Sequence, residues 1–397
     1  MFYIALKMLM GDRAKYIGLL MGISFTAFLV TFAASYFAGF MTRGFSLISE
    51  NNSADVWVMD PAVDSVELTT NMPGSALERV RGVEGVRYAV PLTLGDVDVR
   101  FPNGRFQSFQ VIGVDDATLA GAPILIDGTS PEVIRAPDAV IVDPGGSSGK
   151  MQTPLLKKDQ WPHDGVHLDA PTRELMAGDE LLVNGHRIVV AGRSKTIPRF
   201  PPRPLIYTTY SNATRILPAE TNVLTFVMVS RQPGMSAQQL ARRIQQTTGL
   251  RARTTDEFKE DTVRWYLINS EDVGDMAAML ILAMTVGFGV AGVMLYMFTY
   301  ENLKQYAVLK AMGASRRLLL TMIFVQAGVC ALMGTGIGLG LCAIIGEMVA
   351  TVGFPFRMMW FTPFFGALGV MIVSLTAAAI SVRPVLRLEP GVVFAGR

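Results

Sequence analysis

Four long apolar stretches without Asp, Glu, Lys or Arg stand out in an otherwise mixed sequence of 397 residues. A helix of about 20 mainly apolar residues crosses the hydrocarbon core of a bilayer, which is roughly 30 Å thick. Each stretch is long enough to do so, and the pattern therefore predicts four transmembrane helices. We place them at residues 16–42, 276–300, 318–346 and 358–382.

Mixed sequence rich in Asp, Arg, Pro and Gly fills residues 43–275, between the first and second spans. Frequent Pro and Gly are typical of a folded domain with many turns. The expected fold is therefore a membrane protein with four transmembrane α-helices and a large α+β domain inserted between helices 1 and 2. The remaining segments are residues 1–15, 301–317, 347–357 and 383–397.

Basic residues near the span ends indicate the orientation, because Lys and Arg that flank a span stay in the cytoplasm. We therefore expect the amphipathic N-terminal segment 1–15, the loop 301–317 and the tail 383–397 to be cytoplasmic. The large domain is then periplasmic, and residues 347–357 form a short external loop. The basic residues that carry this bias are Lys7, Arg13, Lys15, Lys304, Lys310, Arg316, Arg317, Arg383, Arg387 and Arg397.

A cleaved signal peptide is the alternative interpretation of residues 16–42, because basic residues precede this stretch. The apolar core of a signal peptide is only about 7 to 15 residues long and ends at a small-x-small cleavage site. This stretch is longer and offers no clean site of that kind. We therefore interpret it as a membrane span.

The large domain shows two strand–helix–strand patterns, one near each of its ends. Asn103-Gly104 predicts a tight turn that joins a strand at 97–100 to one at 106–114. Between the two patterns lies an insert, about 115–210, that we expect to be mostly β. The predicted elements are 56–59, 75–80, 85–100, 223–230, 236–246 with Ser236 as helix N-cap, and 250–254, with insert strands at 139–142, 180–183, 186–191 and 205–208.

Residues 145–150, reading GGSSGK, superficially resemble a phosphate-binding loop. Pro144 stands where that motif needs its first glycine, and Met151 replaces the Ser or Thr that binds magnesium. We expect a flexible exposed loop and no nucleotide site in this chain. The Pro-rich residues 199–204 are likewise expected to be exposed, either as a connector between strands or as a partner-binding loop.

Other candidate sites are weak. His163 and His167 lie four residues apart, but Pro162 and Gly165 disfavour the helix that would bring them together on a metal. Cys330 and Cys342 both fall in the third span and suit packing rather than redox chemistry. No catalytic constellation is evident, and a net charge of +2 gives no support for nucleic-acid binding. We expect neither an enzyme active site nor a metal or cofactor in this chain.

Glycines recur along the spans at spacings that let helix backbones approach closely, as in the G-x-x-x-G pattern. We assign them to packing, either within the chain or between subunits. No ionisable residue lies deep in a span, which disfavours transport driven by an ion gradient. The glycines with the clearest four-residue spacing are Gly18, Gly22, Gly334 and Gly338.

A short charged segment between the second and third spans is the most informative feature for function. Residues 301–315 read ENLKQYAVLKAMGAS, which predicts a basic amphipathic helix. Such a helix suits docking into a cytoplasmic partner. The alternative is a helix that lies on the lipid headgroups, with Lys304 and Lys310 reaching the membrane surface.

The same segment is similar to a stretch of the MacB, FtsX and LolC family of ABC transporter permeases, which reads roughly E-x-x-x-E-I-x-I-L-K-A-L-G-A-S. The tail at 383–390, RPVLRLEP, and the segment 10–22 before the first span also resemble that family. This type VII or mechanotransmission class has one span, a large outer domain and three further spans. The outer domain is large, and in this respect the chain resembles the DevC-like exporter permeases of the family. The residues of segment 301–315 that differ from the family's stretch are Gln305, Tyr306, Ala307 and Met312.

The resemblance implies a homodimer of permease chains, each of which docks its coupling helix on a separate cytoplasmic ATPase that binds ATP and magnesium. Apolar residues of the helix would form the buried contact, with Glu301, Lys304 and Lys310 at its rim. On this basis Leu309→Asp should abolish stimulated ATP hydrolysis. The residues assigned to the coupling helix are Glu301, Leu303, Lys304, Tyr306, Ala307, Leu309, Lys310, Ala311, Met312 and Gly313.

The resemblance also implies a multi-pass protein of the bacterial inner membrane, in contact with membrane lipids, that drives export. A periplasmic adaptor and an outer-membrane duct would then be further partners. Two alternatives stay open: extraction of lipids or lipoproteins, and FtsX-like regulation of a cell-wall hydrolase.

Overall fold

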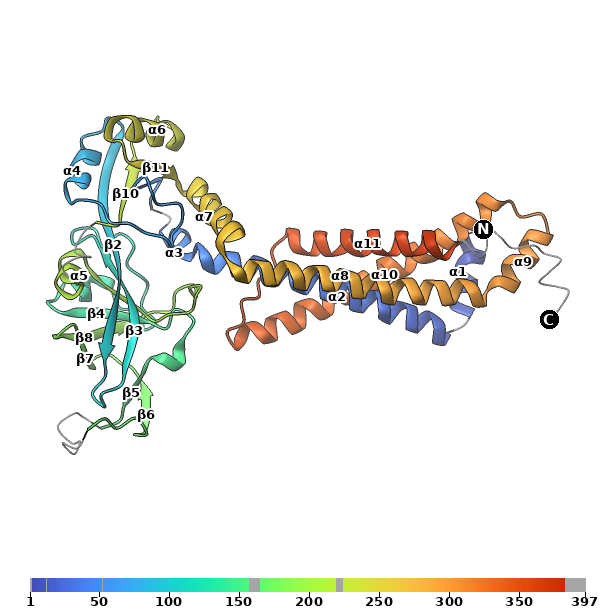
Figure 1. The fold of residues 1–397 in the computed structure, drawn as a ribbon, viewed down its shortest axis with the longest axis horizontal. Coiled ribbons are helices and arrows are strands. Elements are labelled where there is room, and N and C mark those ends of the chain that lie inside the picture. Colours follow the sequence, from blue (N-terminus) through green and yellow to red (C-terminus); the bar gives the residue numbers. More distant parts are fainter. Residues whose placement is uncertain (1, 12, 52, 157–164, 219–223, 383–397) are drawn as a thin grey trace. The chain divides into compact units, whose positions relative to one another are not determined.

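The computed structural model describes residues 2–11, 13–51, 53–156, 165–218 and 224–382 (Figure 1). The chain divides into two compact units. The membrane unit consists of Met1–Phe40 and Ser270–Arg397, and the outer unit is Met41–Asn269. This division follows the change from apolar to mixed sequence.

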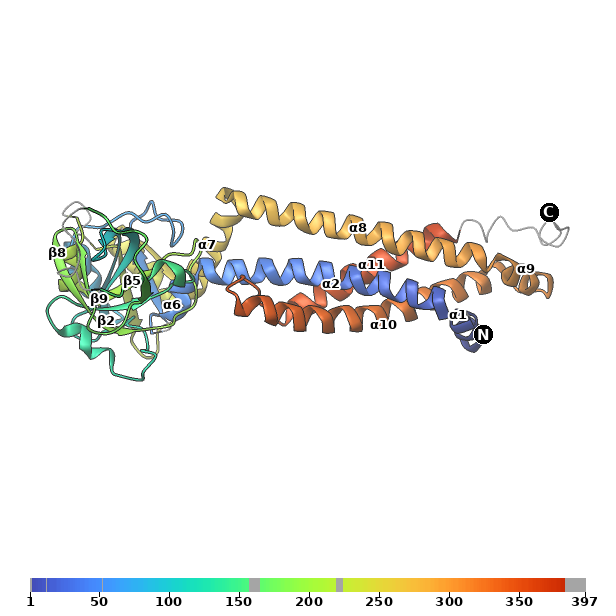
Figure 2. The same cartoon turned by 90° about the horizontal axis from the view of Figure 1, so that it is seen from below.

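Within the described residues, four helices are long and apolar enough to cross a membrane, which confirms the predicted four spans. Several run past the charge-free stretches, because helical hydrogen bonding continues into the polar residues that follow. The short helices α1 and α9 complete the unit, and α9 joins α8 to α10 (Figure 2). The helices are α1 Phe2–Gly11, α2 Arg13–Gly44, α8 Glu271–Glu301, α9 Leu303–Ala311, α10 Arg316–Thr351 and α11 Phe361–Ser381.

Helix α2 packs against the other three spans. Half of its most apolar window is buried, compared with 22% for α8, 28% for α10 and 39% for α11. Glycines on each neighbour allow the close approach: a methyl group at Gly287 would overlap Thr26, and one at Gly338 would overlap the carbonyl oxygen of Ser24. A methyl group at Gly366 would overlap α2 as well. The bundle is therefore held by close approach of these glycine backbones to α2.

The four glycines selected from the sequence occupy different surroundings. Gly22 faces the side chain of Val290 on α8, while Gly334 and Gly338 of α10 face α2. These three lie at helix contacts within the chain. Outside its own helix, Gly18 has no described atom within 4 Å of the position that a Cβ would take.

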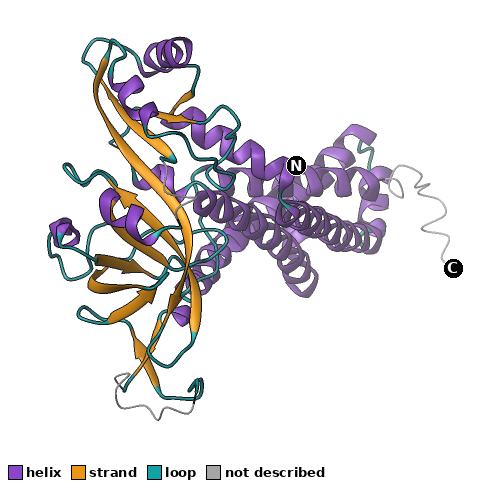
Figure 3. Cartoon of the chain, turned by 60° about the vertical axis from the view of Figure 1, so that its left-hand side comes forward, coloured by secondary structure: helices purple, strands orange, loops and turns teal. Residues whose placement is uncertain are grey.

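The outer unit is built on a nine-stranded sheet with the order β11-β1-β10-β2-β3-β9-β4-β8-β7 (Figure 3). This confirms the mixed α+β prediction, and each predicted strand is present within one to three residues of its expected bounds. The strands are β1 Val56–Met59, β2 Val86–Arg100, β3 Phe106–Val114, β4 Ala139–Asp143, β7 Glu180–Val183, β8 His186–Arg193, β9 Leu205–Thr209, β10 Phe226–Arg231 and β11 Arg251–Thr254, with a separate pair β5 Gln152–Pro154 and β6 Thr172–Glu174.

Helices cover both faces of the β11-β1-β10-β2 portion. On one face, α4 Ser75–Arg81 and α6 Ala237–Thr248 enclose a core that contains Val58, Val80 and Leu240. Ser236 caps α6 as predicted, and Gln239 completes a capping box. On the other face, α3 Ser46–Glu50 and α7 Thr255–Asn269 share a core with the alternate residues of the same strands.

The second portion of the sheet closes on itself. The C-terminal end of β2 pairs with β7, so that β2, β3, β9, β4, β8 and β7 form a ring. Its core contains Val99, Phe109, Val183, Val190 and Ile206. We call this ring the barrel. It includes the mostly β insert and the two preceding strands, because β2 is long enough to pair with β10 at one end and β7 at the other. The short helix α5 Tyr210–Ile216 follows β9.

Two loops that were expected to be exposed are exposed only in part. Gly146, Gly149, Lys150, Pro201 and Pro202 are exposed, but part of each loop is packed. Gly145 is buried at a φ of 52°, and a Cβ there would overlap the carbonyl oxygen of Arg203. Arg199 is only 5% exposed. The two loops pack on each other, a long-range contact that their composition does not reveal. His163 lies outside the described residues, and His167 is half-buried.

The packing on α2 predicts different effects for two glycines of α10. Gly338→Ala forces a methyl group into the backbone of α2 and should destabilise the bundle by about 1–3 kcal/mol. Gly340→Ala, whose Cβ would meet no described atom within 4 Å, is the matched control and should be neutral. Unfolding of the purified chain by titration with a denaturing detergent measures both. Equal stability of the two variants would contradict the contact.

Candidate functional site

The segment between α8 and α10 forms the candidate site, and its helix boundaries are encoded locally. Helix α9 ends at Ala311 with Met312 as its C-cap, and Gly313 follows with a φ of 95°, the left-handed conformation that glycine adopts without strain. The Ser315 hydroxyl then accepts a hydrogen bond from the Leu318 amide at 3.3 Å and caps α10. The sequence Met-Gly-Ala-Ser thus stops one helix and starts the next.

One side of α9 is anchored inside the membrane unit. Tyr306 and Ala307 are 0% exposed, and the Tyr306 hydroxyl donates a hydrogen bond to Oε1 of Gln326 on α10 at 2.9 Å. Burial raises the pKa of the Tyr306 hydroxyl above its ordinary value. The cluster that surrounds this contact contains Leu319, Ile323 and Val382, with Met8, Leu303, Leu309, Ala314 and Leu320 partly buried against it.

This anchor joins α9 to several other elements. Leu319 and Ile323 belong to α10, Val382 follows the last residue of α11, and Met8 belongs to α1. A buried hydrogen bond surrounded by apolar side chains is costly to break, because its polar atoms would lose their partners away from water. The hydrogen bond and the cluster therefore fix the position of α9 against the adjoining ends of α10 and α11.

The other side of α9 is exposed and is partly apolar. Val308 is 42% exposed and Met312 is 70% exposed. Lys304 lies one helical turn before Val308, and Met312 lies one turn after it, so the three share one stripe. We call this stripe, with its neighbours, the docking face. Its exposed residues are Glu301, Lys304, Gln305, Val308, Ala311, Met312 and Gly313.

The expected roles of the coupling-helix residues change accordingly. Tyr306 and Ala307 were assigned to a partner contact, and this is wrong, because both are fully buried inside the chain. Leu303 and Leu309 also pack inward, and Lys310 is half-buried. Val308 and Gln326 were not selected from the sequence. The helical spacing of 304, 308 and 312 was the signal that could have revealed Val308.

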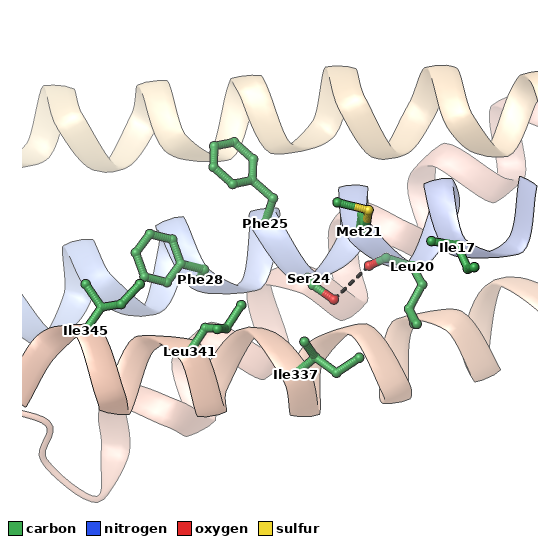
Figure 4. Close-up of a pocket in the computed structure, with 9 residues that line it drawn as sticks. All are labelled: Ile17, Leu20, Met21, Ser24, Phe25, Phe28, Ile337, Leu341 and Ile345. Atoms are coloured by element: carbon green, nitrogen blue, oxygen red, sulfur yellow. Dashed lines mark hydrogen bonds between the residues drawn. The ribbon is translucent and has the colours of Figure 1, made fainter. Parts of the chain in front are cut away.

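A second feature of the membrane unit is an apolar groove of about 420 Å³ between α2 and α10 (Figure 4). Ser24 is the polar side chain in its lining, and its hydroxyl donates to the carbonyl oxygen of Leu20 at 2.7 Å. The groove therefore offers apolar contact without a specific polar anchor. The lining residues are Ile17, Leu20, Met21, Ser24, Phe25, Phe28, Ile337, Leu341 and Ile345.

Metal-ligating residues do not gather elsewhere in the part of the chain that the structure describes: no group of three or more His, Cys, Asp or Glu side chains could hold an ion. Cys330 and Cys342 are both buried as free thiols in α10. Cys330 belongs to the apolar cluster between α2, α8 and α11.

Comparison with known proteins gives a family for the C-terminal part. Residues 277–390 match the family model of the FtsX-like permease C-terminal domain, a range that includes α9 and its anchor on α10. No curated protein matches the chain.

Two solved structures are similar at low scores. One is the periplasmic region of MacB from Actinobacillus actinomycetemcomitans, at a TM-score of 0.36 and 10% identity, covering 55% of this chain and 94% of that one. The other is the extracellular domain of the ABC-type transporter YknZ from Gram-positive bacteria, at a TM-score of 0.32 and 12% identity, covering 51% and 100%.

The anchor predicts that Tyr306→Phe lowers the stability of the membrane unit. The change removes the donor to the buried Gln326 amide oxygen, a loss that costs about 1–3 kcal/mol. Tyr300→Phe is the matched control, because Tyr300 is 57% exposed. Thermal unfolding in detergent measures both variants. An unchanged unfolding temperature for Tyr306→Phe would show that the hydrogen bond does not hold α9.

Proposed function

We propose that this chain is the membrane subunit of an ABC transporter, and that its docking face on α9 binds a separate cytoplasmic ATPase. The FtsX-like permease C-terminal domain supports the transporter assignment. The observation that carries the docking proposal is the division of α9: one side is locked to α10, and the other presents Val308 and Met312 to the outside.

The chemistry of the docking face describes the surface that it would fit. Val308 and Met312 would occupy an apolar hollow on the ATPase, because the core of an interface excludes water around apolar side chains. Lys304, on the same stripe, would pair with carboxylates at the rim of that hollow. The basic loop residues Arg316 and Arg317 support a cytoplasmic position for this face.

Force applied to α9 would reach the spans through its anchor. The Tyr306–Gln326 hydrogen bond and the surrounding cluster connect α9 to α10 and to the end of α11. Two copies of the chain, each with one ATPase, would thus convert closure of the ATPase pair into displacement of the spans. The ATP and magnesium would be bound by the ATPase, and this chain would contribute mechanical coupling.

Export is the substrate-level function that we propose, with the outer unit moving material that a periplasmic adaptor passes to an outer-membrane duct. The apolar groove between α2 and α10 favours a second candidate, the extraction of lipids or lipoproteins. Its lining of Ile17, Phe25 and Leu341, with their neighbours, is compatible with an alkyl chain. Membrane lipids would contact the same surface in either case.

The docking proposal predicts that Met312→Asp releases the ATPase. A carboxylate placed in an apolar hollow loses its hydration, and we expect at least about tenfold weaker binding, which corresponds to ~1.4 kcal/mol. The tagged chain is purified from its native membrane in mild detergent, and the co-purified ATPase and its stimulated hydrolysis are measured. Leu309→Asp is unsuitable here, because Leu309 packs within the membrane unit.

Met176→Asp is the matched control, because Met176 is 52% exposed but lies in the outer unit. It should retain wild-type amounts of the ATPase. Recovery of the wild-type chain without any ATPase, even after crosslinking, would overturn the proposed function. Equal retention by Met312→Asp and Met176→Asp would instead move the docking site away from α9.

A further inference from the structure

The loop between β8 and β9, residues 194–204, forms side-chain and backbone bonds to several other elements of the outer unit. We call it the junction segment. Both strands that flank it belong to the barrel. Its side chains, however, reach helices that lie outside the barrel. The inference below rests on the proposed function, because it concerns how motion of the spans reaches the barrel.

Arg199 binds α3 through a buried set of hydrogen bonds. Its Nη1 donates to the Ser46 hydroxyl at 2.7 Å, and its Nη2 donates to Oε2 of Glu50 at 2.6 Å. Nη2 also donates to the Tyr207 hydroxyl of β9 at 2.9 Å. The second carboxylate oxygen of Glu50 accepts from the Ile197 amide at 2.7 Å. Glu50 is thus bonded at both oxygens by one segment of the barrel.

The same segment binds α7. The Tyr266 hydroxyl donates to the carbonyl oxygen of Phe200 at 3.2 Å, and the two rings pack edge to face with centroids 6.5 Å apart. Arg203 forms an ion pair with Glu67 at 2.5 Å, in the loop that follows β1. Three successive parts of the junction segment therefore hold elements outside the barrel.

On the barrel side, the junction segment is fixed by the turn after β4. Asp143 is fully buried, and its Oδ2 accepts from the Ser194 hydroxyl and the Thr196 amide, both at 2.7 Å. The Arg199 amide donates to the carbonyl oxygen of Gly145 at 3.1 Å. The close approach of Gly145 to Arg203 leaves no room for a side chain. The segment is consequently rigid where it joins the barrel.

The two helices that the junction segment binds, α3 and α7, are directly connected to membrane spans in the chain. Helix α3 begins two residues after the end of α2, and α7 ends two residues before the start of α8. These are the places where the chain passes between the membrane unit and the outer unit. Displacement of the first or second span must therefore enter the outer unit through α3 or α7, and both are bonded to the junction segment.

We propose that the junction segment transmits the motion of the first two spans to the barrel, and that Arg199 is the positioning residue that makes α3, α7 and the barrel move together. Without the Arg199–Glu50 contact, the spans would still respond to the ATPase. The barrel would then contact α3 only through their shared apolar core and would follow its movement less closely.

The electrostatics of the pair are consistent with this role. Burial raises the pKa of Glu50, and the nearby Arg199 only partly offsets that effect. Burial also lowers the pKa of Arg199, but Tyr207 and Glu50 more than compensate, and the net shift is upward. A buried pair of this kind adds little net stability, yet removal of one member leaves the other charge without compensation. The pair therefore fixes a geometry rather than strengthening the fold.

The test measures whether the barrel keeps its position relative to the α6 layer. Spin labels are attached at Gln238→Cys on α6 and His186→Cys on β8, in a full chain that also carries Cys330→Ala and Cys342→Ala. Distances between the labels are measured by pulsed electron resonance in lipid nanodiscs, first for the chain alone. They are then measured with the co-purified ATPase bound to ADP or trapped with vanadate.

We expect one narrow distance distribution for the unsubstituted junction in all three states. Arg199→Gln should broaden the distribution for the chain alone and shift it further between ADP and vanadate. Glu50→Gln, which keeps a hydrogen-bond acceptor of the same size, should do the same to a smaller extent. Arg187→Gln is the matched control, because Arg187 forms an exposed ion pair with Glu180 within the barrel, and it should have no effect.

Three results would overturn the proposal. An unchanged distribution for Arg199→Gln would show that the contact does not hold the barrel. A broadened distribution that is identical with ADP and vanadate would reduce Arg199 to a purely structural role. If the intact chain binds no ATPase, the transmission role fails together with the proposed function, even where the variants still broaden the distribution.

Discussion

The close approach of glycine backbones to α2 is the constraint on which the membrane unit depends. In lipid, no hydrophobic force drives one apolar helix onto another, and association relies on close packing of small residues. Gly287, Gly338 and Gly366 let α8, α10 and α11 each approach the same central helix. The position of α10 fixes Gln326, and Gln326 in turn orients α9 through Tyr306.

Buried polar contacts occur at the two places where the proposed function requires parts of the molecule to move together. Tyr306 and Gln326 join α9 to α10, and Arg199 and Glu50 join the barrel to α3. The first contact joins two consecutive helices, and the second joins residues that lie 149 positions apart. Apolar packing alone would tolerate small slides between such elements, whereas a desolvated hydrogen bond permits one arrangement. We interpret both contacts as devices that define geometry.

In the outer unit, the backbone also connects the helix-covered portion of the sheet to the barrel. Strand β2 pairs with β10 in the helix-covered portion of the sheet and with β7 in the barrel. A single extended strand therefore runs through both portions, and β3 continues beside it. The barrel is therefore attached through this shared strand, through the side chains of the junction segment and through the apolar core that its strands share with α3 and α7.

The sequence by itself determined the elements whose signals are local. Charge-free stretches located the four spans, Asn103-Gly104 located the β2–β3 hairpin, and Ser236 located the start of α6. It also located the helix that forms the candidate site, because a charged segment between two spans is visible in composition alone. Local signals suffice here because hydrogen bonding and solvation within one element set its type and ends.

Only the tertiary structure decided which side of each element faces which neighbour. The apolar residues of α9 suited a partner contact, but Tyr306 and Ala307 are buried against their own chain. The Pro-rich loop that contains Arg199 resembled an exposed connector, although its partner Glu50 lies 149 residues away. An apolar side chain is stabilised by burial and a charged one by a counter-charge, whichever molecule supplies the contact. The sequence pattern therefore does not distinguish a contact with lipid, with another protein or with another part of the same fold.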